Sequence, residues 1–251
     1  MKNENERMND NLVIGRNAVM ELLKSGREIE NILVAKGEHE GSVNKILAIC
    51  RERGIVVKTV DRKKLDSLCA GANHQGVAAN TAAHTYSTVE EMLALAEEKG
   101  EAPFLIICDE IEDGHNLGAI IRTAEACGVH GIIIPKRRSV GLNYTVAKTS
   151  CGALEYVKVA RVGNLAQTIE QLKKKNIWVY AADMDGQRWD KTDFSGGVAL
   201  VVGNEGSGVG RLVKEKCDIT VSLPMRGRVN SLNASVAAGI IMYEIARQRL
   251  G

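Results

Sequence analysis

Glu205, Ser231 and Asn233 are the side chains whose types and spacing best suit the chemistry of holding a small ligand. Glu205 lies in a glycine-rich segment, 203–208, directly after an apolar run, and the other two follow a second apolar run that stops at Pro224. Glycines at the end of a buried strand let the backbone approach a ligand closely, and carboxylate, hydroxyl and amide groups can orient that ligand. The pattern predicts a pocket formed by three neighbouring loops.

The glycines at positions 206, 208 and 210 form a G-x-G-x-G pattern, which is typical of nucleotide-binding α/β folds. In those folds the glycines follow the first strand, whereas here the strand-helix units come before them. The acidic residue expected about 20 positions further on, which would bind a ribose, is replaced by Leu-Pro-Met-Arg at 223–226. No Lys-Ser or Lys-Thr pair completes a Walker motif. The sequence therefore argues against an ordinary Rossmann or Walker site.

The elements that must position these residues alternate between apolar strands and helices. Phe104–Cys108 is a continuous apolar run, as expected for a parallel strand covered on both faces. Asn116 is a candidate N-cap for a helix that ends at Gly128, and Asn164 is one for a helix over 165–175. This alternation predicts an α/β fold with an open parallel sheet over residues 103–251. Its other strands are expected at 132–134, 156–159, 178–182, 198–202 and 219–223.

A small α/β/α domain is predicted ahead of that sheet, over residues 12–84. Residues 1–11 are charged and polar and are expected to form a disordered tail. Residues 85–102, which contain five Glu and one Lys, are expected to form an acidic and partly helical linker. In the small domain, helices are expected at 17–24, 42–53 and 61–69, and strands at 32–35, 55–60 and 77–81.

Composition restricts the class of protein. With 33 Lys and Arg against 31 Asp and Glu, no global basic field indicates nucleic acid, so RNA binding would depend on local basic patches. The six cysteines form no C-x-x-C pair and the five histidines lack metal-ligand spacing, which favours free thiols in a reducing compartment and no metal. No apolar stretch has the length of a membrane span or of a signal-peptide core. We expect a soluble, cytoplasmic protein.

The segment 236–246 is apolar on nearly all sides, with Glu244 as its one charged residue. A helix at a protein surface usually has a single apolar stripe, so this helix is expected to be buried on several sides. A homodimer that covers it is the expected assembly.

Three ordered motifs resemble those of the SpoU/TrmH family of RNA ribose 2′-O-methyltransferases, in the SPOUT superfamily. They are N-x-G-x-I-x-R-T-A at 116–124, G-N-E-G-x-G at 203–208, and Pro224 followed by Ser231-Leu232-Asn233-x-Ser235. In addition, I-G-R-N-A-V at 14–19 and H-Q-G-V at 74–77 resemble the flanks of the ribosomal-protein-L30-like domain of bacterial 23S rRNA guanosine-2′-O-methyltransferases. The resemblance covers residues 12–251. Ala234, where the family more often has Val, departs from it without affecting the polar positions.

The resemblance implies a deep trefoil knot at about 198–251, whose three loops hold S-adenosylmethionine as methyl donor without any metal. The cofactor contacts then fall on Gly203, Leu223 and Leu232, which offer close backbone approach and apolar walls for an adenine ring. The positions that the family uses in catalysis correspond to Asn116, Arg122, Glu205, Ser231 and Asn233.

Each of these catalytic positions also has a purely structural interpretation. Asn116, Ser231 and Asn233 can act as helix N-caps, and Glu205 can be an exposed carboxylate in a turn. Arg122 can pair with the glutamate three residues further on. Because a guanidinium stays protonated, we interpret Arg122 as a hydrogen-bond donor to a phosphate and to the developing 2′-oxyanion rather than as a base.

Basic positions supply the expected contacts with RNA. Contacts with phosphates would position the RNA without reading its sequence. The candidates are Arg16 in the small domain, Lys136 and Arg137 after a strand, and Arg226 and Arg228 in the third motif.

The leading interpretation is methyl transfer from S-adenosylmethionine to the 2′-hydroxyl of a guanosine in 23S rRNA, as free RNA or in a ribosomal precursor particle. The same reaction on tRNA is a second interpretation, which the L30-like domain disfavours because tRNA members usually carry other extensions. A third is a non-catalytic rRNA-binding or ribosome-assembly factor. A purely binding protein has no reason to keep all five polar positions together, which argues against the third.

Overall fold

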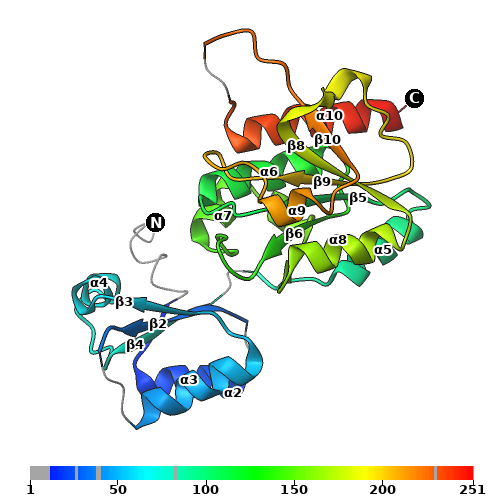
Figure 1. Cartoon of the computed structure of the whole chain (residues 1–251). Coiled ribbons are helices and arrows are strands. Elements are labelled where there is room, and N and C mark those ends of the chain that lie inside the picture. Colours follow the sequence, from blue (N-terminus) through cyan, green and yellow to red (C-terminus); the bar gives the residue numbers. More distant parts are fainter. Residues whose placement is uncertain (1–11, 26–27, 38–40, 82–83, 229–230, 251) are drawn as a thin grey trace. The chain divides into compact units, whose positions relative to one another are not determined.

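In the computed structural model, residues 12–25, 28–37, 41–81, 84–228 and 231–250 are described (Figure 1). The chain divides into two compact units. The tail predicted at residues 1–11 lies outside the described residues. The smaller unit comprises Met1–Thr85 with Gly141–Tyr144, and the larger one Tyr86–Val140 with Thr145–Gly251.

The smaller unit is built on a mixed four-stranded sheet. Strand β2 (Ile29–Ala35) pairs in parallel with β3 (Val57–Val60). Strand β4 (Val77–Thr81) runs antiparallel to β2 and to β1 (Leu12–Ile14), so the order across the sheet is β1-β4-β2-β3.

Helices cover both faces of this small sheet. On one face α2 (Arg16–Ser25) and α3 (Ser42–Arg53) pack over Ile32, and on the other α4 (Arg62–Leu68) packs over Leu33. Neighbouring side chains of a strand point to opposite faces, so one strand supplies both cores. The result is the three-layer α/β/α unit that the sequence pattern predicted.

The larger unit contains a six-stranded sheet in which every neighbouring pair of strands is parallel, as predicted. Its strands are β5 (Phe104–Cys108), β6 (Gly131–Pro135), β7 (Lys158–Val162), β8 (Ile177–Arg188), β9 (Gly197–Val202) and β10 (Ile219–Ser222). The order across the sheet is β10-β8-β9-β5-β6-β7, which places β9 and β5 in the centre. Every residue of β5 is buried, because helices cover both faces of the sheet.

The helices of the larger unit form two layers (Figure 1). One layer contributes Met92 and Leu165 to the core on one face of the sheet, and the other layer lies over the opposite face. The first layer consists of α5 (Val89–Glu98) and α8 (Leu165–Lys173), the second of α6 (Gly114–Ala126) and α10 (Ala234–Arg249), and α7 (Tyr144–Thr149) and α9 (Arg211–Lys214) are short connecting helices. The knot expected at about 198–251 stays a prediction, because the path through 229–230 lies outside the described residues.

Helix α5 corrects the prediction of a linker at 85–102. A capping box begins the helix: Thr88 Oγ1 accepts a hydrogen bond from Glu91 N at 3.2 Å, and the Glu91 carboxylate accepts one from Thr88 N at 2.9 Å. Met92 is fully buried against the sheet, where Gly131 leaves room for it, because a Cβ there would collide with Met92 Sδ. The apolar stripe of this helix therefore makes the segment part of the larger unit.

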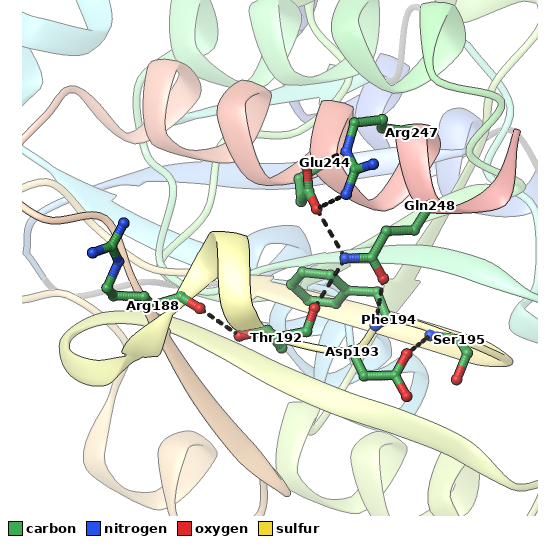
Figure 2. A network of polar contacts seen from close by, with 8 residues as sticks. All are labelled: Arg188, Thr192, Asp193, Phe194, Ser195, Glu244, Arg247 and Gln248. Carbon is green, nitrogen blue, oxygen red and sulfur yellow. Dashed lines mark hydrogen bonds and ion pairs between the residues drawn. The ribbon is translucent and has the colours of Figure 1, made fainter. Parts of the chain in front are cut away.

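Hydrogen bonds of Gln248 connect helix α10 to the segment that leads into β9 (Figure 2). Its Oε1 accepts from Phe194 N and its Nε2 donates to Thr192 O, both at 2.9 Å. The same Nε2 donates to Glu244 Oε1 at 2.9 Å, and Arg247 donates to both oxygens of Glu244. The hydrogen bonds from Arg247, together with that from Gln248, lower the pKa of Glu244 to about 2.

Within a single chain helix α10 is buried on only one side, so the burial on several sides expected from its sequence would require the predicted homodimer and stays a prediction. Ala238, Ile241 and Ile245 are buried, whereas Val236 is 50% exposed and Tyr243 is 58% exposed. The exposed side leaves an apolar surface available for another chain.

Candidate active site

The three predicted loops together enclose a cavity of about 420 Å³. The first loop follows β9, the second follows β10 and the third leads into α10. In open α/β sheets, ligands bind at the carboxyl ends of the strands, which is where these loops lie. The lining residues are Ala182–Met184, Val202–Gly208, Val221, Leu223, Met225, Ser231, Leu232, Ala234, Ala237 and Ile241.

The glycine-rich loop after β9 closes on itself. Asn204 N donates to Gly208 O at 3.1 Å, Gly208 N donates to Asn204 O at 2.8 Å, and Asn204 Oδ1 accepts from Gly206 N at 2.8 Å. A Cβ on Gly203 would collide with the backbone of Gly208. The absence of a side chain at Gly203 therefore allows the two ends of the loop to meet. The close approach of a ligand to the backbone at Gly203 stays a prediction.

Glu205 joins the three motifs in one hydrogen-bonded cluster. Asn116 Nδ2 donates to Glu205 Oε1 at 2.9 Å, and Asn233 Nδ2 donates to the same oxygen. Asn233 Nδ2 also donates to Asn116 Oδ1 at 2.9 Å. Residues separated by 89 and 117 positions in the sequence thus meet at one carboxylate in the wall of the cavity.

Asn233 is the N-cap of α10, as predicted. Its Oδ1 accepts hydrogen bonds from Ser235 N at 3.0 Å, Val236 N at 3.2 Å and Ser235 Oγ at 2.6 Å. These three donors fix which side of the amide is oxygen, so the NH₂ group must face Glu205 and Asn116. The amide oxygen of Asn233 therefore caps the helix, while its amide nitrogen contacts the Glu205 carboxylate.

Asn116 is not the N-cap that the sequence predicted. The cap of α6 is Asp113, whose Oδ1 accepts from His115 N at 2.9 Å, and this backbone hydrogen bond lowers the pKa of Asp113. Asp and Asn are similarly good caps, and here the helix begins one turn earlier than expected. Asn116 is therefore a buried residue in the first turn, with its amide available to Glu205.

Arg122 does not line the cavity. It is six residues beyond Asn116 on α6, which places it about 120° around the helix axis from that residue. Its guanidinium is exposed, and Nη1 donates to Cys151 Sγ at 3.4 Å. Among the ion pairs between described residues, none joins Arg122 to Glu125, so the structural alternative from the sequence finds no support.

Asp183 is a lining residue that the motifs did not indicate. It follows the apolar part of β8, and its Oδ2 accepts a hydrogen bond from Lys214 Nζ at 2.7 Å. Oδ1 accepts from Met184 N at 2.6 Å. The available signal was an acidic residue directly after a buried parallel strand, a position that faces ligands in α/β folds.

The structure divides the predicted site residues into two groups. Glu205, Ser231 and the cofactor candidates Gly203, Leu223 and Leu232 line the cavity, and Asn116 and Asn233 contact it through Glu205. The four basic candidates of the larger unit lie elsewhere on its surface. Lys136 and Arg137 are exposed directly after β6, and Arg226 and Arg228 are exposed between β10 and α10.

The smaller unit has a cavity of its own, of about 430 Å³, with a cationic lining. Arg16 donates from Nε to Gln75 O at 2.9 Å. The turn that carries Gln75 is held by the buried His74, whose Nδ1 accepts from Gly76 N at 2.9 Å and whose Nε2 contacts Asp66 at 2.8 Å. The lining residues are Arg16, Ala35, Lys36, Val43, Arg62, Gln75 and Gly76.

A shallow groove of about 790 Å³ lies over α6 and α10. Its lining includes the exposed apolar residues of α10 described above. The lining residues are Ala119, Thr123, Trp189, Ser235, Val236, Gly239, Ile240, Tyr243, Glu244 and Arg247.

All six cysteines are free thiols. Burial raises the pKa of Cys108 and of Cys217 to about 12 and that of Cys127 to about 11, so these thiols are unreactive at neutral pH. Within the described part of the chain, no group of three or more His, Cys, Asp or Glu side chains could hold a metal ion. The same residues include no helix long and apolar enough to cross a membrane.

Solved structures place this fold among methyltransferases. The SpoU methyltransferase AviRb from Streptomyces viridochromogenes, in complex with AdoMet, matches with a TM-score of 0.60 and 24% identity over 99% of this chain and 95% of that one. The A. aeolicus TrmH/SpoU tRNA modifying enzyme matches with a TM-score of 0.54 and 29% identity over 64% of this chain and 84% of that one. The architecture is that of the SpoU/TrmH methyltransferases.

The sequence comparisons give the family itself. Residues 103–243 match the SpoU rRNA Methylase family, and residues 12–87 match a domain described as RNA 2′-O ribose methyltransferase substrate binding. YacO of Bacillus subtilis (strain 168), named as a member of the TrmH family of tRNA/rRNA methyltransferases, is 52% identical over 94% of this chain and 95% of its own length. The chain belongs to the SpoU/TrmH family and is an RNA methyltransferase, as its motifs indicated.

Proposed function

We propose that this enzyme transfers a methyl group from S-adenosylmethionine to the ribose 2′-hydroxyl of a guanosine in 23S rRNA, free or in a ribosomal precursor particle. The observation that carries the proposal is the meeting of all three motifs at Glu205, in the wall of the three-loop cavity. The match of residues 12–87 to a domain named for 2′-O ribose methyltransferases supports the ribose hydroxyl as acceptor.

The cavity fits S-adenosylmethionine in size and in chemistry. Its volume of about 420 Å³ lies within the usual range for small-molecule sites. Leu223 and Leu232 offer apolar walls to an adenine ring beside the backbone at Gly203, and the carboxylates of Asp183 and Glu205 suit a ligand that carries positive charge. When bound, this cofactor supplies an electrophilic methyl group on a sulfonium centre, and the reaction needs no metal.

The chain's own contribution to catalysis is positioning. Asn116 and Asn233 hold the Glu205 carboxylate in one orientation, and Asn233 is itself held by the N-terminus of α10. Ser231 adds a hydroxyl to the same wall. A preorganised polar wall of this kind keeps the reacting groups in line without reorganising during the reaction.

Arg122 acts on the RNA in this proposal. Its guanidinium can donate hydrogen bonds to the phosphate next to the target ribose and to the 2′-oxygen as negative charge develops there. Because Arg122 lies on a different side of α6 from Asn116, it does not reach the cavity of its own chain. Its neighbour Thr123 lines the groove over α6 and α10, so a second copy docked there would bring Arg122 close to the partner's substrate.

A homodimer through the larger unit is the assembly we propose. The groove over α6 and α10 presents Val236, Ile240 and Tyr243, which are exposed in the single chain. Burying such a patch against its own copy gives the two-fold interface that most soluble oligomers use. A cytoplasmic location, where ribosomal RNA is modified, belongs to the same proposal.

RNA is held by both units. Arg16 borders the cationic cavity of the smaller unit, which suits an RNA phosphate. Lys136, Arg137, Arg226 and Arg228 provide exposed cations on the larger unit. These contacts would set the register of the RNA, while recognition of the target guanosine would come from bases of an unpaired loop.

The deciding experiment measures tritium transfer from labelled S-adenosylmethionine to rRNA and to tRNA, each isolated from cells that lack this protein. We expect counts in 23S rRNA or its precursor particles, and mass spectrometry should locate them on a guanosine 2′-oxygen. Counts in tRNA alone would overturn the rRNA assignment, and counts in neither pool would overturn the proposed reaction. Glu215→Ala, which removes an exposed carboxylate paired with Arg211, is the matched control and should retain activity.

A further inference from the structure

Asp183 lies level with the first glycine of the site, on the neighbouring strand. In the parallel pair of β8 and β9, Ala181 is the partner of Val201. Two residues further along each strand are Asp183 and Gly203, and both line the cavity. A Cβ built on Gly208 would lie 3.9 Å from Asp183 Oδ2, so this carboxylate borders the glycine-rich loop.

Nucleotide-binding α/β folds use such a position for a defined purpose. There the strand next to the glycine-bearing strand ends in an acidic residue, whose carboxylate binds the ribose hydroxyls of the adenosine moiety. In the sequence that residue is sought after the glycines, where this chain has Leu-Pro-Met-Arg at 223–226. The sheet order β10-β8-β9 explains the missing acid, because the strand beside β9 on that side is β8, which precedes the glycines in the chain.

The Asp183 carboxylate is held in place and still has acceptor capacity. Each of its oxygens accepts one protein hydrogen bond, Oδ1 from Met184 N at 2.6 Å and Oδ2 from Lys214 Nζ at 2.7 Å. A carboxylate has about four acceptor positions, so one remains on each oxygen. The side chain is 20% exposed, which leaves it reachable from the cavity.

Glu205, the other carboxylate of the lining, is arranged differently. Its Oε1 receives the amide groups of both Asn116 and Asn233, which commits that oxygen to joining the loops. The two carboxylates therefore have separate tasks, one within the protein and one toward the ligand.

We propose that Asp183 accepts hydrogen bonds from the ribose 2′- and 3′-hydroxyls of the methyl donor, and that Lys214 is a positioning residue for it. The assignment rests on the proposed function, since it requires an adenosine-containing cofactor in this cavity. A vicinal diol presents two donors at the spacing of the two carboxylate oxygens, which is the reason acidic residues recur at ribose sites.

Calorimetric binding of S-adenosylhomocysteine tests the assignment without any measurement of activity. Asp183→Ala should weaken its binding by about tenfold to a hundredfold, the usual cost of losing hydrogen bonds to a charged group. The same variant should bind the 2′,3′-dideoxy analogue of S-adenosylhomocysteine as well as the unmodified protein does. It should lose affinity for 5′-methylthioadenosine, which keeps the ribose but lacks the amino acid, by the same factor as for S-adenosylhomocysteine.

Asp185→Ala is the matched control, since it removes an exposed acid two residues away that does not line the cavity. It should bind all three ligands as the unmodified protein does. Lys214→Met should weaken the two ribose-containing ligands less than Asp183→Ala does, because it leaves the carboxylate in place.

Three outcomes would overturn the assignment to ribose. An equal loss for the dideoxy analogue would mean that Asp183 acts through the shape of the loop. A loss for S-adenosylhomocysteine but not for 5′-methylthioadenosine would mean that the carboxylate faces the ligand's ammonium group. Unchanged binding by Asp183→Ala would exclude any contact. Failure of the unmodified protein to bind S-adenosylhomocysteine would instead contradict the proposed function.

Discussion

The two units each have a cavity of similar volume, about 420 Å³ in the larger and about 430 Å³ in the smaller, but the charges of their linings are opposite. The larger unit contributes carboxylates from Asp183 and Glu205, whereas the smaller unit contributes cations from Arg16, Lys36 and Arg62. A cavity lined by acids favours a ligand with positive charge, and one lined by cations favours phosphate. Under the proposed function, this difference allows a chain with a net charge of only +2 to bind a sulfonium cofactor in one unit and RNA in the other.

The largest effect is expected at the acidic cavity. Glu205→Ala should lower kcat by about a hundredfold to a thousandfold, because it removes the group that joins the three motifs and preorganises the site. Single-turnover methylation of the RNA substrate measures this. The control is Glu215→Ala, and equal rates for the two variants would show that the acidic cavity is not the site of reaction.

A large effect is also expected from mixing two inactive variants. Arg122→Ala and Asn116→Ala should each be nearly inactive alone, without exceeding the loss caused by Glu205→Ala, because one lacks the guanidinium and the other the amide on Glu205. If a second copy supplies Arg122, heterodimers refolded from an equimolar mixture contain one complete site, so roughly a quarter of the activity should return. A mixture as inactive as its components would place Arg122 and Asn116 in the same chain's site.

An intermediate effect is expected at the cationic cavity. Arg16→Ala should raise the KM for RNA several-fold and reduce its salt dependence, while the affinity for S-adenosylhomocysteine stays unchanged. Lys24→Ala, which removes an exposed cation paired with Glu21 on the same helix, is the control. A change in cofactor affinity with Arg16→Ala would contradict the proposal that the cofactor binds only in the acidic cavity and RNA in the cationic one.

The smallest effect is expected outside both cavities, at Glu244. Its folded-state pKa of about 2 lies below the ordinary value of 4.5, so its contribution to stability is fully present above pH 4.5 and is lost as the pH falls through 2. Glu244→Gln should therefore lower Tm by roughly 2–4 °C at pH 7, for a loss of about 1 kcal/mol, and the difference should vanish toward pH 2. Thermal unfolding followed by circular dichroism at both pH values measures it. A Tm difference that is independent of pH would mean that the contacts of Gln248 and not the charge of Glu244 stabilise the helix.

Elements with strong local signals were predictable from the sequence. The strands Val77–Thr81 and Phe104–Cys108 and the helix Ser42–Arg53 agree with their predicted bounds. The run Phe104–Cys108 is apolar throughout, and Gly54 ends the helix in the left-handed conformation, with a φ of 65°. The burial of α5 was not predictable, because an acidic amphipathic helix looks the same whether or not a sheet lies beneath its apolar stripe.

The polar residues of the site were predictable as a set but not in their individual roles. Asp113 and Asn116 are both good caps, and only the point at which the chain turns into α6 decides which of them performs that role. The sequence did not distinguish Asp183 from the other acidic residues, because its position at the cavity depends on which strand lies beside β9.

By itself, the sequence determined the parallel α/β class of the larger unit, the small unit before it and the three motifs that identify the family, because apolar periodicity and motif spacing are properties of neighbouring residues. Only the tertiary structure decided that these motifs meet at one carboxylate, that Arg122 points away from it, and that an acid earlier in the chain stands beside the glycine-rich loop. The physical reason is that strand order in a sheet is set by long-range packing and need not follow the order of the chain.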